Sequence, residues 1–280
     1  MTRDARTAAM FVAPALAAIA LVALFPIAWT IWESLHLHDL RMPWRGRPFV
    51  GLDNYAEIAR DARFWEALAH TVMFTVAVVA LEIVLGLALA LLLDRPMRGR
   101  GALRVAALLP WAIPTVVVAL VWRFMFEAQA ADWLVTPAAA WVPIVAADVW
   151  RMTPFVAILL LAGLQQIDPA IYEAARMDGA GPWRQFRDIT VPLLRPALVV
   201  AVLFRALDAF RVFDLIFVIT GGGPGTATEP LSLYAFTALM RNLRFGFGSA
   251  LSVVVFAIAF AGALLWVTLV GRSALLEKPE

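Results

Sequence analysis

The sequence predicts an all-α integral membrane protein with six transmembrane helices. Of its 280 residues, 62% are hydrophobic and 16% are charged, and the mean hydropathy is +0.81, far from the composition of a soluble globular protein. The apolar residues form six runs, each long enough to cross a bilayer as a helix. The runs cover about residues 8–32, 67–93, 102–126, 141–165, 196–220 and 246–271. We therefore expect a single transmembrane domain over residues 1–280.

The first apolar run has two interpretations. The basic segment MTRDAR precedes it, as in a secretory signal peptide. The apolar core of a signal peptide spans roughly 7–15 residues, however, and this run is longer. No small-residue cleavage site separates the run from the WESLH that follows it. We therefore expect a retained membrane helix.

Cysteine and histidine usage excludes several kinds of site. The chain has no cysteine, so it forms no disulfide and no thiolate metal site. Its three histidines, His36, His38 and His70, are scattered, and the HLHD stretch that holds two of them is expected to be a solvated loop. A metal site is therefore not expected.

The distribution of basic residues predicts which side of the membrane each loop faces. If the N-terminus is cytoplasmic, the inner segments carry twelve arginines and lysines, and the outer segments carry seven. The first outer loop also carries six acids between Glu33 and Glu66. This bias predicts that both termini are cytoplasmic. The net charge of +2 follows from the same topology, so no nucleic-acid partner is expected.

A polar segment lies between the fourth and fifth runs, on the cytoplasmic side of the predicted topology. Asp168 is expected to cap a helix that starts at Pro169. Gly179 is expected to end this helix, because glycine tolerates a left-handed backbone. Pro182 is expected to open a second short helix, which Pro192 closes. The segment is therefore predicted to be a pair of short exposed helices.

The same segment carries more apolar surface than a linker needs. Its first helix has a small-residue face, and large apolar side chains lie on both helices. These residues are Glu173, Ala174 and Ala175, and then Tyr172, Met177, Trp183 and Phe186. From the residues alone, the segment is either a solvated hairpin on the membrane surface or a docking surface for a partner.

The stretch EAARMDGA, followed by Ile189 and Pro192, resembles the EAA loop of permease subunits of ABC importers. That pattern consists of E-A-A, a following glycine and then I-x-x-P, and it matches here without gaps. Two further stretches, FDLIFVITGGGP at residues 213–224 and VGLDNYAEI at residues 50–58, are similar to carbohydrate permeases of the maltose and trehalose type. The resemblance covers nearly the whole chain and indicates the maltose-F-like or trehalose-permease-A-like partner of two permease subunits.

This resemblance implies a type I ABC importer permease fold in a bacterial plasma (inner) membrane, and it implies partners. A second homologous permease, two copies of an ATP-binding subunit and an extracytoplasmic sugar-binding lipoprotein are expected, together with membrane lipid. The segment over residues 168–195 would form the coupling helices that dock on the ATP-binding subunit. The residues expected at this joint are Tyr172, Glu173, Ala174, Ala175, Asp178, Gly179 and Ala180.

The chain itself is not expected to bind ATP or Mg²⁺. A P-loop needs a lysine after G-x-x-x-x-G, and the one lysine of the sequence is Lys278, beside the C-terminus. The glycine-rich GGGPG at residues 221–225 falls on the outer side and is interpreted as a turn out of the membrane. ATP hydrolysis is therefore expected in separate subunits, and this chain is not expected to be an enzyme.

Several ionisable residues lie within the predicted membrane helices, where each costs roughly a few kcal/mol unless it is paired or faces water. They are Glu82, Arg123, Asp148, Arg151, Arg205, Asp208, Arg211 and Asp214. The last four alternate in sign every three residues, a spacing at which neighbours on a helix can pair. They either neutralise one another and hold the bundle together, or some of them face a polar cavity and hydrogen-bond sugar hydroxyls.

Depth in the membrane favours the cavity for a subset of these residues. Arg151 and Arg211 each lie about nine or ten residues from the outer end of a predicted helix, near one level about 14 Å down. By the resemblance, sugar contacts come from these two helices. An aromatic face is expected beside the polar groups, with Phe155 or Phe210 able to stack on a sugar ring. The expected substrate path is Asp148, Arg151, Met152, Phe155, Asp208, Phe210 and Arg211, with Ala209 and Val212 at aligned positions.

Four prolines interrupt the third and fourth runs, and they fit either moving joints or static kinks. They are Pro110, Pro114, Pro143 and Pro154.

Other function classes fit the sequence less well. A secondary transporter should show repeated halves, and a membrane enzyme needs a nucleophile–base or metal constellation, but neither feature is evident. A trehalose- or maltose-like disaccharide is the favoured solute. A permease for glycerol phosphate or another polar solute is the alternative, because the membrane arginines suit a phosphate.

Overall fold

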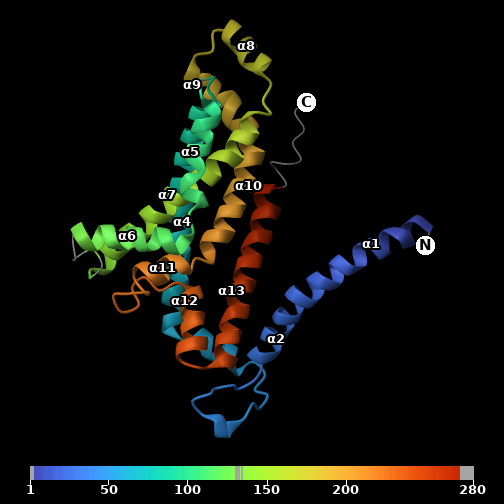
Figure 1. Cartoon of the computed structure of the whole chain (residues 1–280), viewed down its shortest axis with the longest axis vertical. Coiled ribbons are helices and arrows are strands. Elements are labelled where there is room, and N and C mark those ends of the chain that lie inside the picture. The colour runs from blue at the N-terminus through green and yellow to red at the C-terminus, as the bar shows by residue number, and fades with distance from the viewer. Residues whose placement is uncertain (1–2, 97, 130–132, 134, 272–280) are drawn as a thin grey trace. The chain divides into compact units, whose positions relative to one another are not determined.

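Helices account for the regular structure of the described part of the chain (Figure 1). The structure is a computed structural model, and it describes residues 3–96, 98–129, 133 and 135–271. Within these ranges the β-type pairing is limited to two isolated bridges, one between His36 and Phe49 and one between Asp39 and Arg244. Helices satisfy their own backbone hydrogen bonds inside a bilayer, which is why apolar runs of this length fold this way. The predicted all-α class is confirmed.

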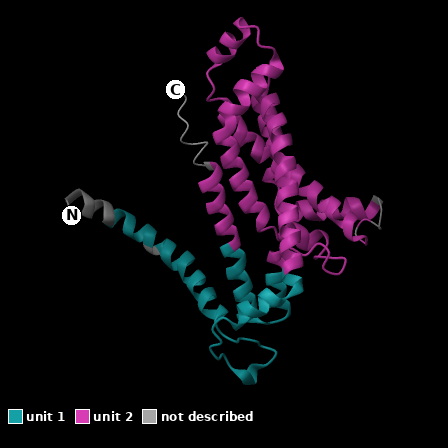
Figure 2. Ribbon diagram, turned by 180° about the vertical axis from the view of Figure 1, so that it is seen from behind, with its two compact units in different colours: residues 1–64, 234–257 teal, residues 65–233, 258–280 magenta. Residues whose placement is uncertain are grey.

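The chain folds as two compact units, which Figure 2 distinguishes by colour. Unit 1 comprises residues 1–64 and 234–257, and unit 2 comprises residues 65–233 and 258–280. Three helices continue from one unit into the other. They are α4 (Ala62–Asp94), α12 (Leu231–Phe236) and α13 (Phe245–Trp266).

Five helices among the described residues are long and apolar enough to cross a membrane, and a bent pair of helices supplies a sixth candidate. The predicted number of six spans therefore agrees with the structure when the bent pair counts as one. The five are Met10–Ser34, Ala62–Asp94, Pro137–Leu164, Pro182–Phe210 and Phe245–Val270, and the pair is Arg100–Ala112 with Thr115–Ala128.

The third apolar run is bent rather than one continuous helix over residues 102–126. It forms α5 (Arg100–Ala112) and α6 (Thr115–Gln129), and the two spans meet at 83°. The break follows Ile113, whose backbone is extended with ψ at 133°. A residue that precedes a proline avoids the helical region, because its backbone clashes with the proline ring, and Pro114 comes next. Pro110 remains inside α5.

The fifth apolar run also differs from the predicted helix over residues 196–220. Helix α10 (Val191–Phe210) ends at Phe210, and the short α11 (Asp214–Ile219) begins after a non-helical link. Two charged residues, Arg205 and Asp208, lie near the end of α10, and Arg211 is the first residue of the link; their pairing is described below. The segment therefore leaves the helical path in the middle of the run.

The second short helix of the polar segment does not close at Pro192. Helix α9 (Pro182–Gln185) continues through the π-helical turn η4 (Phe186–Thr190) directly into α10. Pro192 lies in the first turn of α10. The wider π turn just before it relieves the clash between the proline ring and the preceding carbonyls, so the helix runs on. This part of the predicted hairpin is therefore wrong.

Unit 1 joins its helices through a buried asparagine in the VGLDNYAEI stretch. The side-chain amide of Asn54 donates to the carbonyls of Ser34 at 2.8 Å and of His36 at 3.1 Å, where α2 ends. The hydroxyls of Ser34 and Tyr55 lie 2.6 Å apart. The elements of this unit are α1 (Arg3–Ile19), η1 (Ala20–Leu24), α2 (Phe25–Ser34), η2 (Pro43–Arg45), α3 (Asp53–Arg60) and η5 (Thr237–Arg241).

The HLHD stretch is packed in unit 1, and the prediction of a solvated loop is wrong. The imidazole of His36 is buried and approaches the carbonyl of Trp32 at 2.7 Å. His38 contacts the buried carboxyl group of Glu33 and stacks on Phe245. Polar atoms that leave water need partners, and these histidines find theirs on neighbouring elements.

Unit 2 packs α4, α7 (Pro137–Leu164) and α10 around a core of small and branched side chains. A Cβ atom added at Gly86 would lie 2.6 Å from Val156, and one added at Gly163 would lie 2.6 Å from Ala197. These glycines therefore let the helices approach closely, as small residues do in membrane bundles. The unit also contains α8 (Pro169–Met177) and η6 (Val267–Gly271).

Candidate functional site

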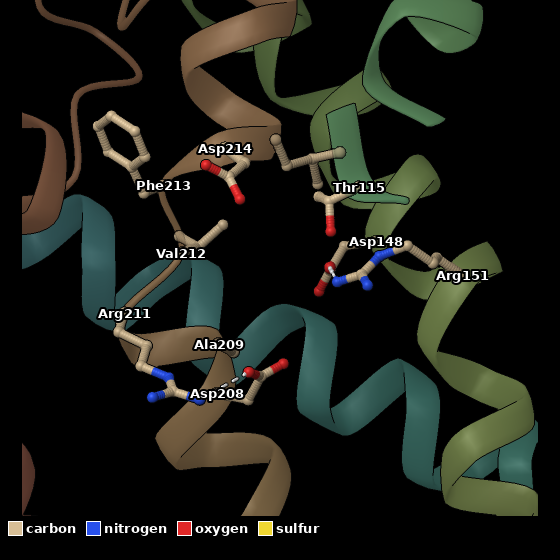
Figure 3. Close-up of a pocket in the computed structure, with 10 residues that line it drawn as sticks. Thr115, Asp148, Arg151, Asp208, Ala209, Arg211, Val212, Phe213 and Asp214 are labelled. Atoms are coloured by element: carbon tan, nitrogen blue, oxygen red, sulfur yellow. Dashed lines mark hydrogen bonds and ion pairs between the residues drawn. The ribbon is translucent and has the colours of Figure 1, made fainter. Parts of the chain in front are cut away.

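A polar cavity of about 210 Å³ lies in unit 2, where α6 and α11 begin (Figure 3). Most of its polar lining is charged, and Figure 3 shows these side chains coming from three different segments around one space. The lining residues are Thr115, Asp148, Arg151, Asp208, Ala209, Arg211, Val212, Phe213, Asp214 and Leu215. The cavity therefore combines residues that are far apart in the sequence.

Both helix breaks of unit 2 border this cavity. The break before α6 places Thr115 in the lining, and the break after α10 places Arg211 to Phe213 there. Irregular backbone at membrane depth has unpaired N–H and C=O groups, which are tolerated where they line a polar cavity or are buried in protein. The proline at 114 and the charged link after Phe210 therefore open the bundle at one place.

A fully buried arginine organises the charges beneath the cavity. Arg205 on α10 donates Nε and Nη2 to the carboxylate of Glu82 on α4, at 2.5 and 2.8 Å. Its Nη2 also donates to Asp148 on α7 at 2.9 Å, and its Nη1 donates to Asp208 at 2.6 Å. One guanidinium therefore ties three helices together, using the planar fork of donors that suits carboxylates.

Two further arginines complete this network. Arg151 lies 3.5 Å from Asp148, and Arg211 lies 3.4 Å from Asp208. Together with Arg205 and Glu82 they give three guanidinium and three carboxyl groups, so the network is neutral when all six are ionised. Buried charges are retained only when they are paired in this way.

The residues that line the cavity have a different net charge from the network as a whole. Asp148, Asp208 and Asp214 line it, against Arg151 and Arg211. Asp214 is exposed, and no cation of the described residues lies within ion-pair distance of it. The surface that a solute would meet therefore carries one more carboxylate than guanidinium.

The structure brings four of the seven expected path residues together around this cavity: Asp148, Arg151, Asp208 and Arg211. The other three are not among its lining residues. Met152 is buried, Phe155 stacks on Trp111 with ring centroids 5.8 Å apart, and Phe210 is the last residue of α10. The aligned residues Ala209 and Val212 do line the cavity.

Sequence reasoning did not assign Glu82, Arg205, Thr115 or Asp214 to the site. Glu82 and Arg205 stood out as charges within membrane helices. They pair with each other across 123 positions of the sequence, and no local pattern indicates such a pair. Thr115 was detectable from the proline before it, because a helix break exposes the first residues of the next helix.

The polar segment between α7 and α10 has the local geometry that its residues predict. The side chain of Asp168 accepts the N–H of Ala170 at 2.9 Å and so caps α8. At the other end, Gly179 has φ at +78°, and the N–H of Ala180 reaches the carbonyl of Ala175 at 2.9 Å. This is the hydrogen-bond pattern of a Schellman motif, so the predicted helix end is confirmed.

The segment exposes several of its small and polar residues and two of its large apolar ones. Glu173, Ala174, Asp178 and Gly179 are exposed, Tyr172, Ala175 and Ala180 are half-buried, and the side chains of Met177 and Trp183 are 89% and 71% exposed. The hydroxyl of Tyr172 meets that of Thr190 at 3.0 Å and holds α8 against the turn into α10. Exposed methionine and tryptophan on a small polar segment are typical of interaction surfaces.

Comparisons with known proteins identify the family. A family model described as binding-protein-dependent transport system inner membrane component matches residues 82–275. The trehalose/maltose transport system permease protein MalF of Thermococcus litoralis is 41% identical over 96% of this chain and 95% of its own length. The sulfoquinovosyl glycerol transport system permease protein SmoG of Agrobacterium fabrum is 35% identical over 95% and 91%.

A solved structure shows the same fold. A chain of a bacterial alginate ABC transporter, crystallised with an alginate-pentasaccharide-bound periplasmic protein, superposes with a TM-score of 0.80 at 21% identity, over 97% of this chain and 96% of that one. The type I importer permease fold is thus confirmed. With the family model covering most of the chain, this protein is a multi-pass membrane protein that belongs to the binding-protein-dependent transport system inner membrane components.

Proposed function

We propose that this chain is one of two transmembrane subunits of an ABC importer and forms the translocation path for a neutral sugar, with a trehalose- or maltose-like disaccharide favoured. The path includes the polar cavity of unit 2. A sugar-binding protein outside the membrane delivers the solute, and separate subunits bind ATP and Mg²⁺ and hydrolyse the ATP. The family and the 41% identical trehalose/maltose relative support this assignment. The sequence also has no lysine at the position that a P-loop needs.

The charge of the cavity lining is the observation that favours a neutral solute. The relatives alone do not choose, because one is named for trehalose and maltose and another for sulfoquinovosyl glycerol. An anionic solute would meet three carboxylates against two guanidiniums, and Arg211 and Arg151 are both close to an aspartate. Hydroxyl groups, in contrast, donate to carboxylates and accept from guanidiniums without adding charge.

The size of the cavity favours a path shared between two permeases. Its volume of about 210 Å³ is below the roughly 300–1,000 Å³ of pockets that enclose small ligands. One sugar ring and its hydroxyls fit such a space better than a whole disaccharide does. The second permease would supply the remaining surface, which agrees with a path between two homologous subunits.

Two features support the proposed orientation, with the polar segment in the cytoplasm. The arginine bias favours a cytoplasmic position for this segment, and its exposed Met177 and Trp183 would present an apolar surface to a protein partner. Tyr172, Glu173 and the small residues after it would then dock on the ATP-binding subunit. The same orientation places both termini in the cytoplasm.

Asp214 gives the cleanest test of the path, because its removal leaves no buried cation unpaired. In the assembled transporter with its binding protein, Asp214→Asn should raise the KM for trehalose or maltose uptake about tenfold, the effect of roughly 1.4 kcal/mol in charge-assisted hydrogen bonds. It should also weaken the exclusion of phosphorylated sugars. Asp94→Asn, which removes a carboxylate that does not line the cavity, is the matched control.

Assembly and binding-protein-stimulated ATPase activity should stay normal in both variants. The proposal fails if Asp214→Asn and Asp94→Asn have the same uptake kinetics as the parent chain. It also fails if the unmodified transporter carries sugar phosphates better than the neutral sugars, since the excess of carboxylates would then have the wrong sign.

A further inference from the structure

Two arginines at the start of α5 share one uncharged acceptor. With its amide oxygen turned toward them, Gln165 accepts from Nη2 of Arg104 at 2.6 Å and from Nη2 of Arg100 at 3.1 Å. The two arginines are one helical turn apart, so their side chains leave the same face of α5. Two positive groups are thus brought together on a neutral amide.

No described carboxylate neutralises this pair. Neither Arg100 nor Arg104 has an acidic partner within ion-pair distance in the described ranges, and Nε of Arg104 is buried without a hydrogen-bond partner. Gln165 follows the C-terminus of α7, whose partial negative charge attracts cations, but α5 starts at Arg100 and contributes a partial positive charge of similar size. Partial charges of about half a unit at helix ends do not neutralise two guanidinium groups, so their positive charge remains.

The pair also lies where a membrane protein meets lipid headgroups. Gln165 comes directly after α7, a membrane-spanning helix that ends at Leu164, and its side chain is exposed. In Figure 1 the end of α7 and the start of α5 are at the end of unit 2 that carries α8 and α9. Two more exposed arginines, Arg95 and Arg98, precede the pair in the sequence.

We propose that Arg100 and Arg104 form a binding site for the phosphate of an anionic phospholipid headgroup. The site would lie in the leaflet on the side of the polar segment over residues 168–195, called the coupling segment below. Basic pockets between membrane helices on the cytoplasmic side are suited to such headgroups. The phosphate supplies the missing negative charge and accepts from both guanidiniums, while Gln165 holds them in register. This site is separate from the solute cavity and from the docking surface of the coupling segment.

Native mass spectrometry of the assembled transporter tests this proposal. The complex is reconstituted in bilayers of phosphatidylglycerol and phosphatidylcholine, extracted into mild detergent, and analysed for retained lipid. The parent complex should retain phosphatidylglycerol, and the Arg100→Gln/Arg104→Gln variant should lose about nine-tenths of it. Arg98→Gln removes an exposed arginine of the same segment, and this control should retain the lipid.

Two further measurements separate the alternatives. Arg104→Lys keeps the charge and should retain most of the lipid, which keeps the proposal testable if the double glutamine variant does not assemble. Inorganic phosphate at millimolar concentration should not displace the lipid, because the acyl chains add affinity. Retention of phosphate alone, equal lipid loss in Arg98→Gln, or loss of an ATP-binding subunit with lipid retained would each overturn the proposal.

Discussion

The charged network under the cavity and the proposed coupling segment over residues 168–195 are stabilised in different ways. In the network, a buried Arg205 contacts carboxylates on three helices, and its partners are set by tertiary packing. In the coupling segment, the arginines and acids are exposed, and a cap at Asp168 and a left-handed Gly179 set the shape. One region owes its form to long-range pairing and the other to local backbone chemistry.

This difference predicts which substitutions should reduce the stability of the protein and which should alter its surface. Loss of Arg205 leaves the carboxylate of Glu82 buried away from water without a cation, which costs several kcal/mol. A lost charge in the coupling segment is compensated by solvent, so its cost is small. A change of backbone conformation in that segment, however, would alter the surface offered to a partner.

Removing Arg205 should have the largest effect. Arg205→Gln leaves Glu82 buried without a cation and leaves Asp148 with only Arg151, at 3.5 Å. We expect a loss of about 3–5 kcal/mol, which is a large part of the stability of a typical domain. Thermal unfolding and the yield of monodisperse transporter measure this loss. Arg211→Gln is the matched control, because that side chain is 76% exposed and should change stability by less than about 1 kcal/mol.

Neutralising the partner at the same time should restore part of the stability. The double variant Arg205→Gln/Glu82→Gln buries one carboxylate fewer, so it should unfold at a higher temperature than Arg205→Gln alone. If Arg205→Gln is no more destabilising than Arg211→Gln, the network does not hold α4, α7 and α10 together.

A backbone change in the coupling segment should have an intermediate effect on assembly. Gly179→Ala places a side chain at φ +78°, which costs about 1 kcal/mol, although nothing lies within 4 Å of the added Cβ. We expect roughly fivefold weaker retention of the ATP-binding subunit and less ATP-driven uptake, with normal membrane insertion. Pull-down with the ATP-binding subunit measures the first quantity.

Gly181→Ala is the matched control for this change. Gly181 is equally open to an added Cβ, but its φ is −69°, which any residue adopts. Equal retention of the ATP-binding subunit by both variants would show that the backbone conformation at Gly179 does not matter for docking. Local backbone chemistry would then not explain the function of this segment.

The same contrast explains how much the sequence could predict. The cap at Asp168 and the end at Gly179 were correct because a few neighbouring residues determine them. The break after Ile113 was indicated by Pro114, which was expected to act as a joint or a kink, but its size of 83° was not predicted. The break after Phe210 was missed, since hydropathy measures the length of an apolar run and not the path of its backbone. The HLHD stretch was predicted to be solvated, because its partners, such as Phe245, come from distant parts of the chain.

The candidate site shows the same division. Asp148, Arg151, Asp208 and Arg211 were expected on the path, and they meet at one cavity, because charge inside a membrane helix is itself a local signal. The pairing of Arg205 with Glu82 required knowledge of which helices are neighbours. Similarly, Phe155 is an aromatic at a plausible position, but its contact with Trp111 depends on how α5 packs against α7.

The smallest effect is expected at an ion pair of unit 1 in which one partner is buried and the other is exposed. Asp39 is buried, but its partner Arg41 is 51% exposed, and Nη2 of Arg41 lies 2.6 Å from Oδ2 of Asp39. The hydrogen bonds from the Arg41 side chain lower the pKa of Asp39 below its ordinary value. Because the folded protein favours the charged form, the pair stabilises above the ordinary aspartate pKa of about 4, and this contribution falls as the pH drops toward the lowered pKa.

Asp39→Asn should therefore lower the unfolding temperature at pH 7 by only about 1–2 °C, since a half-exposed partner limits the pair to roughly 0.5 kcal/mol. The difference from the parent chain should persist from pH 7 to pH 5 and shrink below about pH 4, where the parent carboxylate becomes protonated. Asp53→Asn, at an exposed position on α3, should show no such dependence. A stability difference that grows toward low pH would contradict the expected sign of the linkage. A loss of stability as large as that of Arg205→Gln would show that the exposure of Arg41 does not weaken its pair with the buried Asp39.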